Sequence, residues 1–209
     1  VQERPGGTEN EKLGEIGSVE LSIEAIEVFS KSVVLPFELK REDVNEDTRL
    51  KYRYLDLRRK DMHDKLILRS QIMKVIRDYL YEEGFNEFET PILAKSTPEG
   101  ARDYVVPSRT QPGKFFALPQ SPQLFKQLMM VAGFERYFQI ARCMRDEDLR
   151  SDRQPEFTQL DIEMSFIEQE DVLDLMERLM QRIWKEIKGV DIKIPFPRMS
   201  YDEAMKKYN

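Results

Sequence analysis

The chain has 209 residues, of which 33 are basic and 39 acidic, so its formal net charge at pH 7 is −6. This length suggests one full domain, or one domain with part of another, and the acidic balance argues against a protein that coats nucleic acid with its whole surface. Hydrophobic residues make up 40% of the chain, which is enough for a packed core and argues against global disorder.

Neither a membrane protein nor a secreted protein is indicated. The longest apolar run, Leu128–Ala132, is far shorter than the ~18–20 residues that span a bilayer. The chain starts with Val1 and no apolar signal segment follows, so we expect a piece excised from a longer, cytoplasmic chain without a membrane partner.

The chain contains few reactive side chains. Cys143 and His63 are the single cysteine and the single histidine, so an intramolecular disulfide is impossible and a Cys/His zinc site is not indicated. The nine glycines form neither a G-x-G-x-x-G fingerprint nor a P-loop. Nucleotide binding would therefore need another design, and neither Cys143 nor His63 receives a role.

The first 60 residues show only weak structural patterns. Alternating apolar residues over Gly17–Val28, with a bulge where the phase slips, predict a half-buried strand. A single strand cannot bury its own face, so we expect it to belong to a sheet that is mostly absent. A linker over 31–45 follows, and the strongly basic stretch Arg49–Arg59 is compatible with a helix.

The next elements alternate between helices and short strands. Asp61–Glu83 predicts a long amphipathic helix that turns these residues inward: Leu66, Ile72, Met73, Ile76, Tyr79 and Leu80. Phe85–Leu93 is strand-like, and a Pro-Gly turn separates two further short strands, Tyr104–Val106 and Phe115–Leu118. Ser121, as an N-cap followed by proline, then predicts a helix that ends near Gly133.

Two alternating strands, over 138–145 and 157–166, predict an antiparallel hairpin around a charged loop. One face of this hairpin takes Gln139, Ala141, Cys143 and Arg145 from the first strand and Phe157, Gln159, Asp161, Glu163 and Ser165 from the second. This polar face is either a solvated sheet surface or a binding surface for an ionic substrate, with a cationic row beside an acidic row.

The last third of the chain returns to helices. An amphipathic pattern runs over Glu170–Lys188 and ends at Gly189, and Ser200 with Glu203 forms a capping box that opens a further helix. The order of the elements predicts an α+β fold in which helices flank an antiparallel sheet.

Several stretches of the sequence resemble class II aminoacyl-tRNA synthetases. Cys143–Arg150 with Arg153–Gln159 resembles their motif 2, and Gly84–Pro91 resembles their motif 1. Thr97–Tyr104 and Gln120–Gln127 are similar to the aspartyl-tRNA synthetases of the bacterial type, and less so to the lysyl and asparaginyl relatives. The similarity runs through nearly the whole chain.

The resemblance implies a fragment with motifs 1 and 2 of a partial class II antiparallel sheet. Residues 1–30 would be the C-terminal tail of an anticodon-binding OB-fold β-barrel, 31–60 a hinge, and 61–209 the N-terminal part of the catalytic domain. In the family, an inserted domain, a metal-holding acid and the motif 3 arginine follow. We therefore expect no metal ligand within this chain, and a folded but inactive fragment when the 209 residues stand alone.

The implied reaction has two steps and uses ATP with Mg²⁺. The carboxylate of L-aspartate attacks the α-phosphorus of ATP to give aspartyl-adenylate and pyrophosphate, and the aspartyl group then passes to tRNA. By resemblance, Arg145 is the catalytic residue that binds the α-phosphate and the substrate carboxylate. The further ATP contacts would be Asp146, Glu147 and Gln154.

The implied aspartate pocket combines a turn, a helix and the polar strand face: Glu99, Ser121, Gln123, Lys126, Arg145, Gln159 and Asp161. Lys126 would bind the side-chain carboxylate of aspartate, or it is a solvated helix lysine. Glu99 would bind the substrate ammonium from a mobile lid, or it is an ordinary exposed turn residue. Gln159 and Asp161 would hold the ammonium and orient the lysine, or they are cross-strand partners of the arginine.

Further residues are implied at tRNA and dimer contacts. Arg150 and Arg153 would reach the tRNA acceptor end, or they neutralise neighbouring acids of the loop. Pro91 would lie at a homodimer interface, or it is an edge-strand proline, or both. The basic run over 49–60 would touch the tRNA backbone, although a solvated helix face explains it nearly as well.

Two other function classes compete with aspartate–tRNA ligation. One is a class II paralogue that makes a free small molecule such as an aspartate amide, but the OB-like tail and the basic hinge favour tRNA. The other is a non-catalytic dimerisation or tRNA-binding module, which would not need Lys126, Arg145 and Asp161 together. The sequence does not decide whether tRNA for asparagine is charged as well.

Overall fold

The computed structural model describes residues 1–208, without the side chains of Glu11, Lys12 and Glu15. The chain divides into two units, Val1–Lys60 and the residues from Asp61 onward. The elements are, in chain order, β1 (Gln2–Glu3), the 3₁₀ helix η1 (Glu11–Ser18), β2 (Val19–Glu20), α1 (Glu46–Lys51), α2 (Arg53–Asp56), α3 (Lys60–Glu82), β3 (Asn86–Glu87), β4 (Val105–Pro107), β5 (Phe115–Ala117), α4 (Gln123–Val131), β6 (Arg136–Met144), β7 (Glu156–Met164), α5 (Gln169–Lys188) and α6 (Tyr201–Tyr208).

The first unit begins with a short antiparallel pair, β1 with β2, and residues 21–45 form no helix or strand. The strand predicted over 17–28 is therefore wrong outside β2. Among the described residues it has only the two-residue β1 to pair with, and a strand needs ladder partners along its whole length. Leu21, Ile23 and Ile26 are consequently exposed.

The basic stretch forms two short helices instead of one, because the backbone leaves helical angles at Tyr52 (φ −110°, ψ 48°). Asp56 is fully buried and pairs with Arg49 at 2.8 Å and with Arg53. The hydrogen bond from Arg49 holds the pKa of Asp56 below its usual range. Part of the basic run thus neutralises a buried acid within its own unit.

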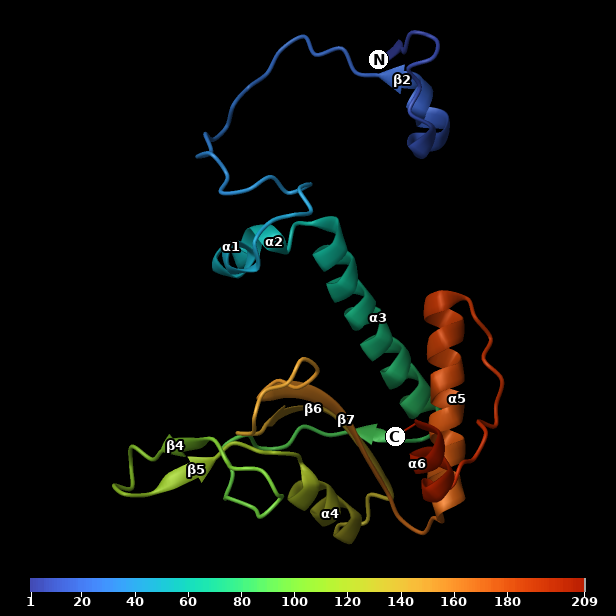
Figure 1. Ribbon diagram of the computed structural model, residues 1–209. Helices are drawn as coiled ribbons and strands as arrows, with labels where there is room; N and C mark the ends of the chain where they lie inside the picture. Colours follow the sequence, from blue (N-terminus) through green and yellow to red (C-terminus); the bar gives the residue numbers. More distant parts are fainter. Residues whose placement is uncertain (209) are drawn as a thin grey trace. The chain divides into compact units, whose positions relative to one another are not determined.

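The second unit is built on a sheet with the strand order β3–β6–β7. β6 and β7 pair antiparallel along their whole length, from Arg136 opposite Met164 to Met144 opposite Glu156, which confirms the predicted hairpin. The short β3 joins parallel to β6 at the edge. Helices α3 and α5 pack on the apolar face of the hairpin and α4 lies on its polar face (Figure 1). The predicted α+β class is confirmed.

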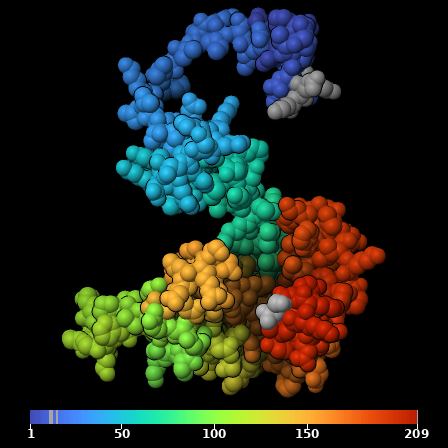
Figure 2. All heavy atoms as spheres, in the orientation of Figure 1, coloured from blue at the N-terminus to red at the C-terminus, as the bar shows by residue number. Residues whose placement is uncertain are grey.

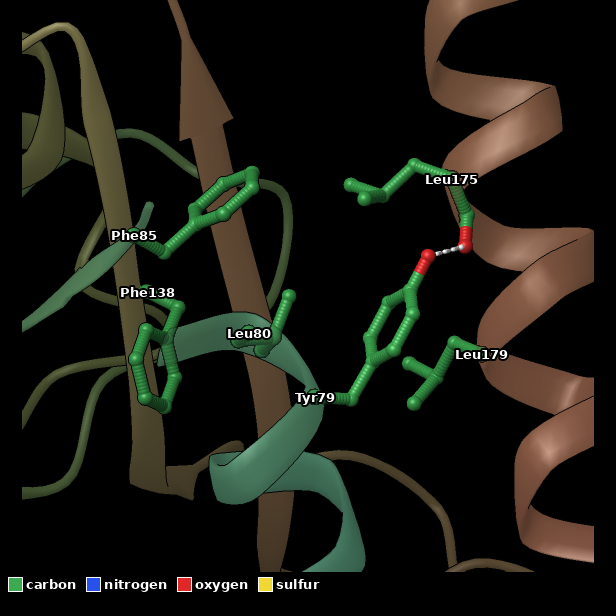
Figure 3. Packing of buried hydrophobic residues seen from close by; sticks show 6 residues of the cluster. All are labelled: Tyr79, Leu80, Phe85, Phe138, Leu175 and Leu179. Atoms are coloured by element: carbon green, nitrogen blue, oxygen red, sulfur yellow. Dashed lines mark hydrogen bonds between the residues drawn. The ribbon is translucent and has the colours of Figure 1, made fainter. Parts of the chain in front are cut away.

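The core joins α3, α5 and β6. Its buried side chains are drawn in Figure 3: Tyr79, Leu80, Phe85, Phe138, Leu175 and Leu179. The Tyr79 hydroxyl donates a hydrogen bond to the Leu175 carbonyl at 3.0 Å, and burial raises the pKa of Tyr79 to about 12. This packing holds the hairpin from its apolar side, so the opposite, polar face is carried by a rigid scaffold.

The strand predicted over 85–93 is wrong beyond β3. The last ladder contact is the hydrogen bond from the Phe88 N–H to the Phe138 carbonyl at 3.0 Å, after which the backbone leaves β6. Pro91 has no N–H to donate, which suits a segment that departs from the sheet.

The remaining predicted elements are confirmed, with small shifts. β4 pairs antiparallel with β5, and this hairpin projects from the rest of the second unit (Figures 1 and 2). The N-cap of α4 is Pro122, one residue later than predicted. Leu66, expected to face inward, is 49% exposed, because the buried positions of α3 lie between Val75 and Leu80. None of the helices in residues 1–208 carries an apolar stretch long enough to cross a bilayer.

Candidate active site

The polar face of the hairpin and helix α4 together hold a lysine between two carboxylates. Lys126 Nζ lies 2.9 Å from Asp161 Oδ1 and 3.3 Å from Glu163 Oε2, and 13% of its side chain is exposed. Burial by itself lowers the pKa of Lys126, but the hydrogen bonds to the two acids outweigh it, so the pKa is raised. Lys126 is therefore a largely enclosed, ion-paired cation and not a solvated helix lysine.

A chain of hydrogen bonds fixes the carboxylate that faces this lysine. Gln159 Nε2 donates to Asp161 Oδ2 at 2.6 Å, and the Cys143 thiol donates to Gln159 Oε1 at 3.9 Å. These side chains share one face because the strand register sets Ala141 opposite Gln159. The two acids hold the Lys126 ammonium by ion pairs on the polar face of the hairpin.

Arg145 lies just beyond the end of β6. Its Nε donates to the Gln120 carbonyl at 3.2 Å, and its guanidinium lies over the Phe157 ring at 5.1 Å. On this side of the hairpin Arg145 follows β6, whereas the other cation, Lys126, comes from α4. The guanidinium fork is held by stacking and by one backbone contact, which leaves its terminal amino groups for oxyanions.

Residues 96–103, here called the lid loop, pack against the start of α4. Glu99 accepts hydrogen bonds from Thr97 Oγ1 at 2.8 Å and from Ser121 Oγ at 2.6 Å. Ser121 Oγ in turn accepts from the Gln123 N–H at 3.3 Å. Glu99 and Ser121 also line a cavity of about 210 Å³ beneath the lid loop. Glu99 is therefore a held carboxylate rather than a free turn residue.

The charged loop after β6 meets the lid loop at one point. The Asp146 N–H donates to the Arg102 carbonyl at 3.0 Å, and the Asp146 carboxylate lies 3.5 Å from the Arg102 guanidinium. A backbone bridge near the tip joins Arg150 to Arg153. The other loop residues predicted to bind substrates are exposed, namely Glu147, Gln154, Arg150 and Arg153. The structure therefore brings Asp146 to the lid loop but not these four.

Pro91 lies apart from the ionic cluster. It is exposed and lines a hollow of about 510 Å³ beside β3, together with Phe88, Gln139 and Arg142. The position fits a proline at a sheet edge, and its place in a dimer interface stays a prediction.

Comparison with known proteins supplies the family. A family model described as tRNA synthetases class II (D, K and N) matches residues 45–209. The chain belongs to this family. Two proteins named aspartate–tRNA(Asp/Asn) ligase, from Anoxybacillus flavithermus and Aquifex aeolicus, are 61% and 59% identical over 209 residues, which is 100% of this chain and 35% and 34% of those proteins.

Two further similarities agree with this assignment to the class II synthetases. A protein named aspartate–tRNA ligase from Halalkalibacterium halodurans is 57% identical over 100% of this chain and 35% of its own length. A crystal structure assigned as an aspartyl-tRNA synthetase from Leishmania major Friedlin superposes with a TM-score of 0.65 and 29% identity, over 75% of this chain and 31% of that chain. The chain spans about a third of the length of the curated relatives that it matches.

The described residues do not bring metal-binding side chains together. Within residues 1–208, no group of three or more His, Cys, Asp or Glu side chains is arranged to hold a metal ion. The acids of the polar face do not fit Mg²⁺, because Asp161 and Glu163 are both engaged by the Lys126 ammonium.

Sequence reasoning missed two residues of this site. Glu163 is the second acid on Lys126, and the signal was present, since strand alternation sets it on the same face as Asp161. Gln120 contacts both Arg145 and the lid loop. Its contacts depend on how distant segments pack, and no spacing in the sequence indicates them.

Proposed function

We propose that this chain is the part of an aspartate–tRNA ligase that binds L-aspartate and the α-phosphate of ATP. In the first step a carboxylate oxygen of aspartate bonds to the α-phosphorus and pyrophosphate leaves. In the second, a hydroxyl of the terminal adenosine of tRNA attacks the acyl carbon and AMP leaves. The observation that carries the proposal is the ion-paired Lys126 between Asp161 and Glu163. The names of the relatives supply the substrates.

Lys126 is the proposed ligand of the aspartate side chain. Its charge is secured by Asp161 and Glu163, and an ammonium can donate to a substrate carboxylate as well. A preoriented ammonium favours a carboxylate over an amide, because a hydrogen bond between two charged groups is stronger than one to a neutral acceptor. The same cluster would discriminate aspartate from asparagine.

Arg145 is the proposed catalytic residue. Negative charge grows on the α-phosphate oxygens as the carboxylate attacks, and a guanidinium that is already held by Phe157 and by the Gln120 carbonyl stabilises that charge without reorganising. On the loop that follows, Asp146, Glu147 and Gln154 are the proposed further contacts to ATP. Mg²⁺ would accompany ATP and neutralise its phosphates.

The lid loop and the start of α4 are proposed to hold the substrate amino group. Glu99 is already fixed by Thr97 and Ser121, and its carboxylate is the complement of an ammonium. Gln123, Gln159 and Asp161 supply the other polar groups of the proposed pocket. Binding of the substrate ammonium would give a function to the two hydrogen bonds that hold the Glu99 carboxylate.

The remaining partners are also part of the proposal. Arg150 and Arg153 are exposed cations on the loop and are proposed to meet the tRNA acceptor end. Residues 1–30 are proposed as the tail of an OB-fold domain, 31–60 as the hinge and 61–209 as part of the catalytic domain. We further propose a homodimer through Pro91, and a cytoplasmic location, where tRNA is charged.

The test is aspartate-dependent exchange between ATP and pyrophosphate by the full-length protein that contains this chain. Exchange with L-aspartate, and not with asparagine or lysine, is expected because of the Lys126 cluster. Absence of exchange would favour the non-catalytic module. Exchange without transfer to tRNA would favour the paralogue that makes a free small molecule.

A further inference from the structure

Gln120 is a buried polar side chain where three segments of the second unit meet. It is 1% exposed and lies between β5 and α4. An amide buried this deeply must find hydrogen-bond partners within the protein, because unsatisfied buried polar groups are costly. Its partners lie on the lid loop on one side and on Arg145 on the other.

The side-chain amide of Gln120 binds the lid loop at Ala101 and Asp103. Oε1 accepts from the Ala101 N–H at 3.0 Å, and Nε2 donates to the Ala101 carbonyl at 2.9 Å and to Asp103 Oδ1 at 2.5 Å. These partners fix the orientation of the amide, because the reversed amide would set its oxygen against a carbonyl and a carboxylate. Asp103 also accepts a hydrogen bond from Ser96, which joins the two ends of the lid loop.

The backbone beside Gln120 is tied to the end of β6. The Met144 N–H donates to the Pro119 carbonyl at 2.9 Å, and Arg145 Nε donates to the Gln120 carbonyl at 3.2 Å. The next residue, Asp146, binds the lid loop directly through its N–H. A displacement of residue 120 would therefore disturb both the lid loop and the guanidinium.

We propose that Gln120 is a positioning residue that couples the lid loop to Arg145. The proposal rests on the function proposed above, in which Glu99 on the lid loop binds the substrate ammonium and Arg145 binds the α-phosphate. Ordering the lid loop around aspartate then also holds the guanidinium in place for ATP, and ATP on Arg145 orders the lid loop in return, because coupling between two sites is reciprocal.

The test is the change Gln120→Met in the full-length protein, since methionine keeps the length of the side chain and removes its hydrogen bonds. The control is Gln127→Met, an exposed position on the nearby helix α4. In Gln120→Met, we expect kcat for ATP–pyrophosphate exchange to fall and the KM for aspartate to rise, each about tenfold. The reason is that the buried hydrogen-bond partners of Gln120 are left unsatisfied. Glu99→Gln is expected to raise the KM for aspartate alone.

A second readout separates coupling from a general loss of structure. Hydrogen–deuterium exchange of the peptide 96–103 is measured with and without ATP alone. ATP is expected to protect this peptide in the unaltered protein and in Gln127→Met, but not in Gln120→Met. Equal protection in all three, or none in the unaltered protein, would overturn the proposal.

The fallback variant is Gln120→Asn, in which a shorter amide cannot reach Ala101. If Gln120→Met does not fold, the same loss of protection by ATP is expected in Gln120→Asn, and retained protection overturns the proposal. Failure of the proposed function gives a different result. The unaltered protein would then show no aspartate-dependent exchange between ATP and pyrophosphate, whether or not ATP protects the lid loop.

Discussion

The ammonium of Lys126 lies on the polar face of the hairpin, between two acids. We therefore expect it to affect the binding of aspartate and not the binding of ATP. Lys126→Ala in the full-length protein is expected to raise the KM for aspartate roughly tenfold or more, because losing a charge-assisted hydrogen bond costs ~1.5–3 kcal/mol. The KM for ATP is expected to change little. Exchange kinetics measure both, with the exposed Lys114→Ala as the control; equal effects on the two substrates would contradict the assignment.

Arg145 is expected to act on the rate rather than on binding. Arg145→Ala should lower kcat for adenylate formation by about 10²–10³, the loss typical of one group that stabilises transition-state charge. Arg142→Ala is the matched control, since Arg142 is an exposed arginine of β6, three residues before Arg145, and pairs with Glu156 at 2.9 Å. Near-normal exchange between ATP and pyrophosphate in the Arg145 variant would exclude the catalytic role.

The buried thiol of Cys143 is expected to make the stability of the protein depend on pH. Burial raises the pKa of Cys143 to about 11. The thiol of the unfolded chain ionises near pH ~8.5, so the contribution of Cys143 to stability is present below that pH and is lost as the pH rises toward the folded-state value. Denaturant unfolding measures the loss of stability between pH 7 and pH 10, which is expected to be smaller in Cys143→Ala than in the unaltered protein. The same loss of stability in both proteins would contradict this contribution of Cys143.

At the scale of elements, the hairpin and the helices were predictable because their signals are local. The alternation of polar and apolar residues predicts that Gln159, Asp161 and Glu163 share one face, without knowledge of the pairing strand. Gly189 likewise predicts the end of helix α5. The strands expected over 17–28 and 85–93 failed for a shared reason: a strand exists only where another strand pairs with it, and alternation says nothing about the partner.

The lid loop depends on one backbone conformation that glycine allows. Gly100 has φ of +102°, where a side chain costs about 1–3 kcal/mol. Gly100→Ala is therefore expected to raise the KM for aspartate severalfold and, because the lid loop is proposed to be coupled to Arg145, to lower kcat as well. Gly133→Ala imposes a similar strain after α4, at φ +89°, and is the control. An equal rise in the KM for aspartate in both variants would show that the effect is not local to the lid loop.

At the scale of the molecule, the candidate site is assembled from segments that are far apart in sequence. The resemblance to the synthetases indicated Lys126, Arg145 and Asp161 in advance, whereas the contact between Gln120 and the lid loop arises from packing alone. The polar face could be read from alternation, but the docking of α4 on it could not. Residue types were therefore predictable, and their mutual distances were not.

The homodimer is the prediction that concerns the whole protein. Leu66 and Ile67 are 49% and 45% exposed on α3, and Pro91 is exposed at the sheet edge, which together offer apolar surface to a second copy. In an isologous dimer each change is introduced twice, so Leu66→Lys with Ile67→Lys places four charges at the interface, and burying unpaired charges is costly.

Analytical ultracentrifugation at micromolar concentration measures the outcome on the full-length protein. The unaltered protein is expected to be a dimer and the double variant a monomer. Val131→Lys replaces another exposed apolar residue, on α4, and is expected to remain dimeric. A monomeric unaltered protein would contradict the dimer itself, whereas a double variant that stays dimeric would show that the copies meet through a surface other than this part of α3.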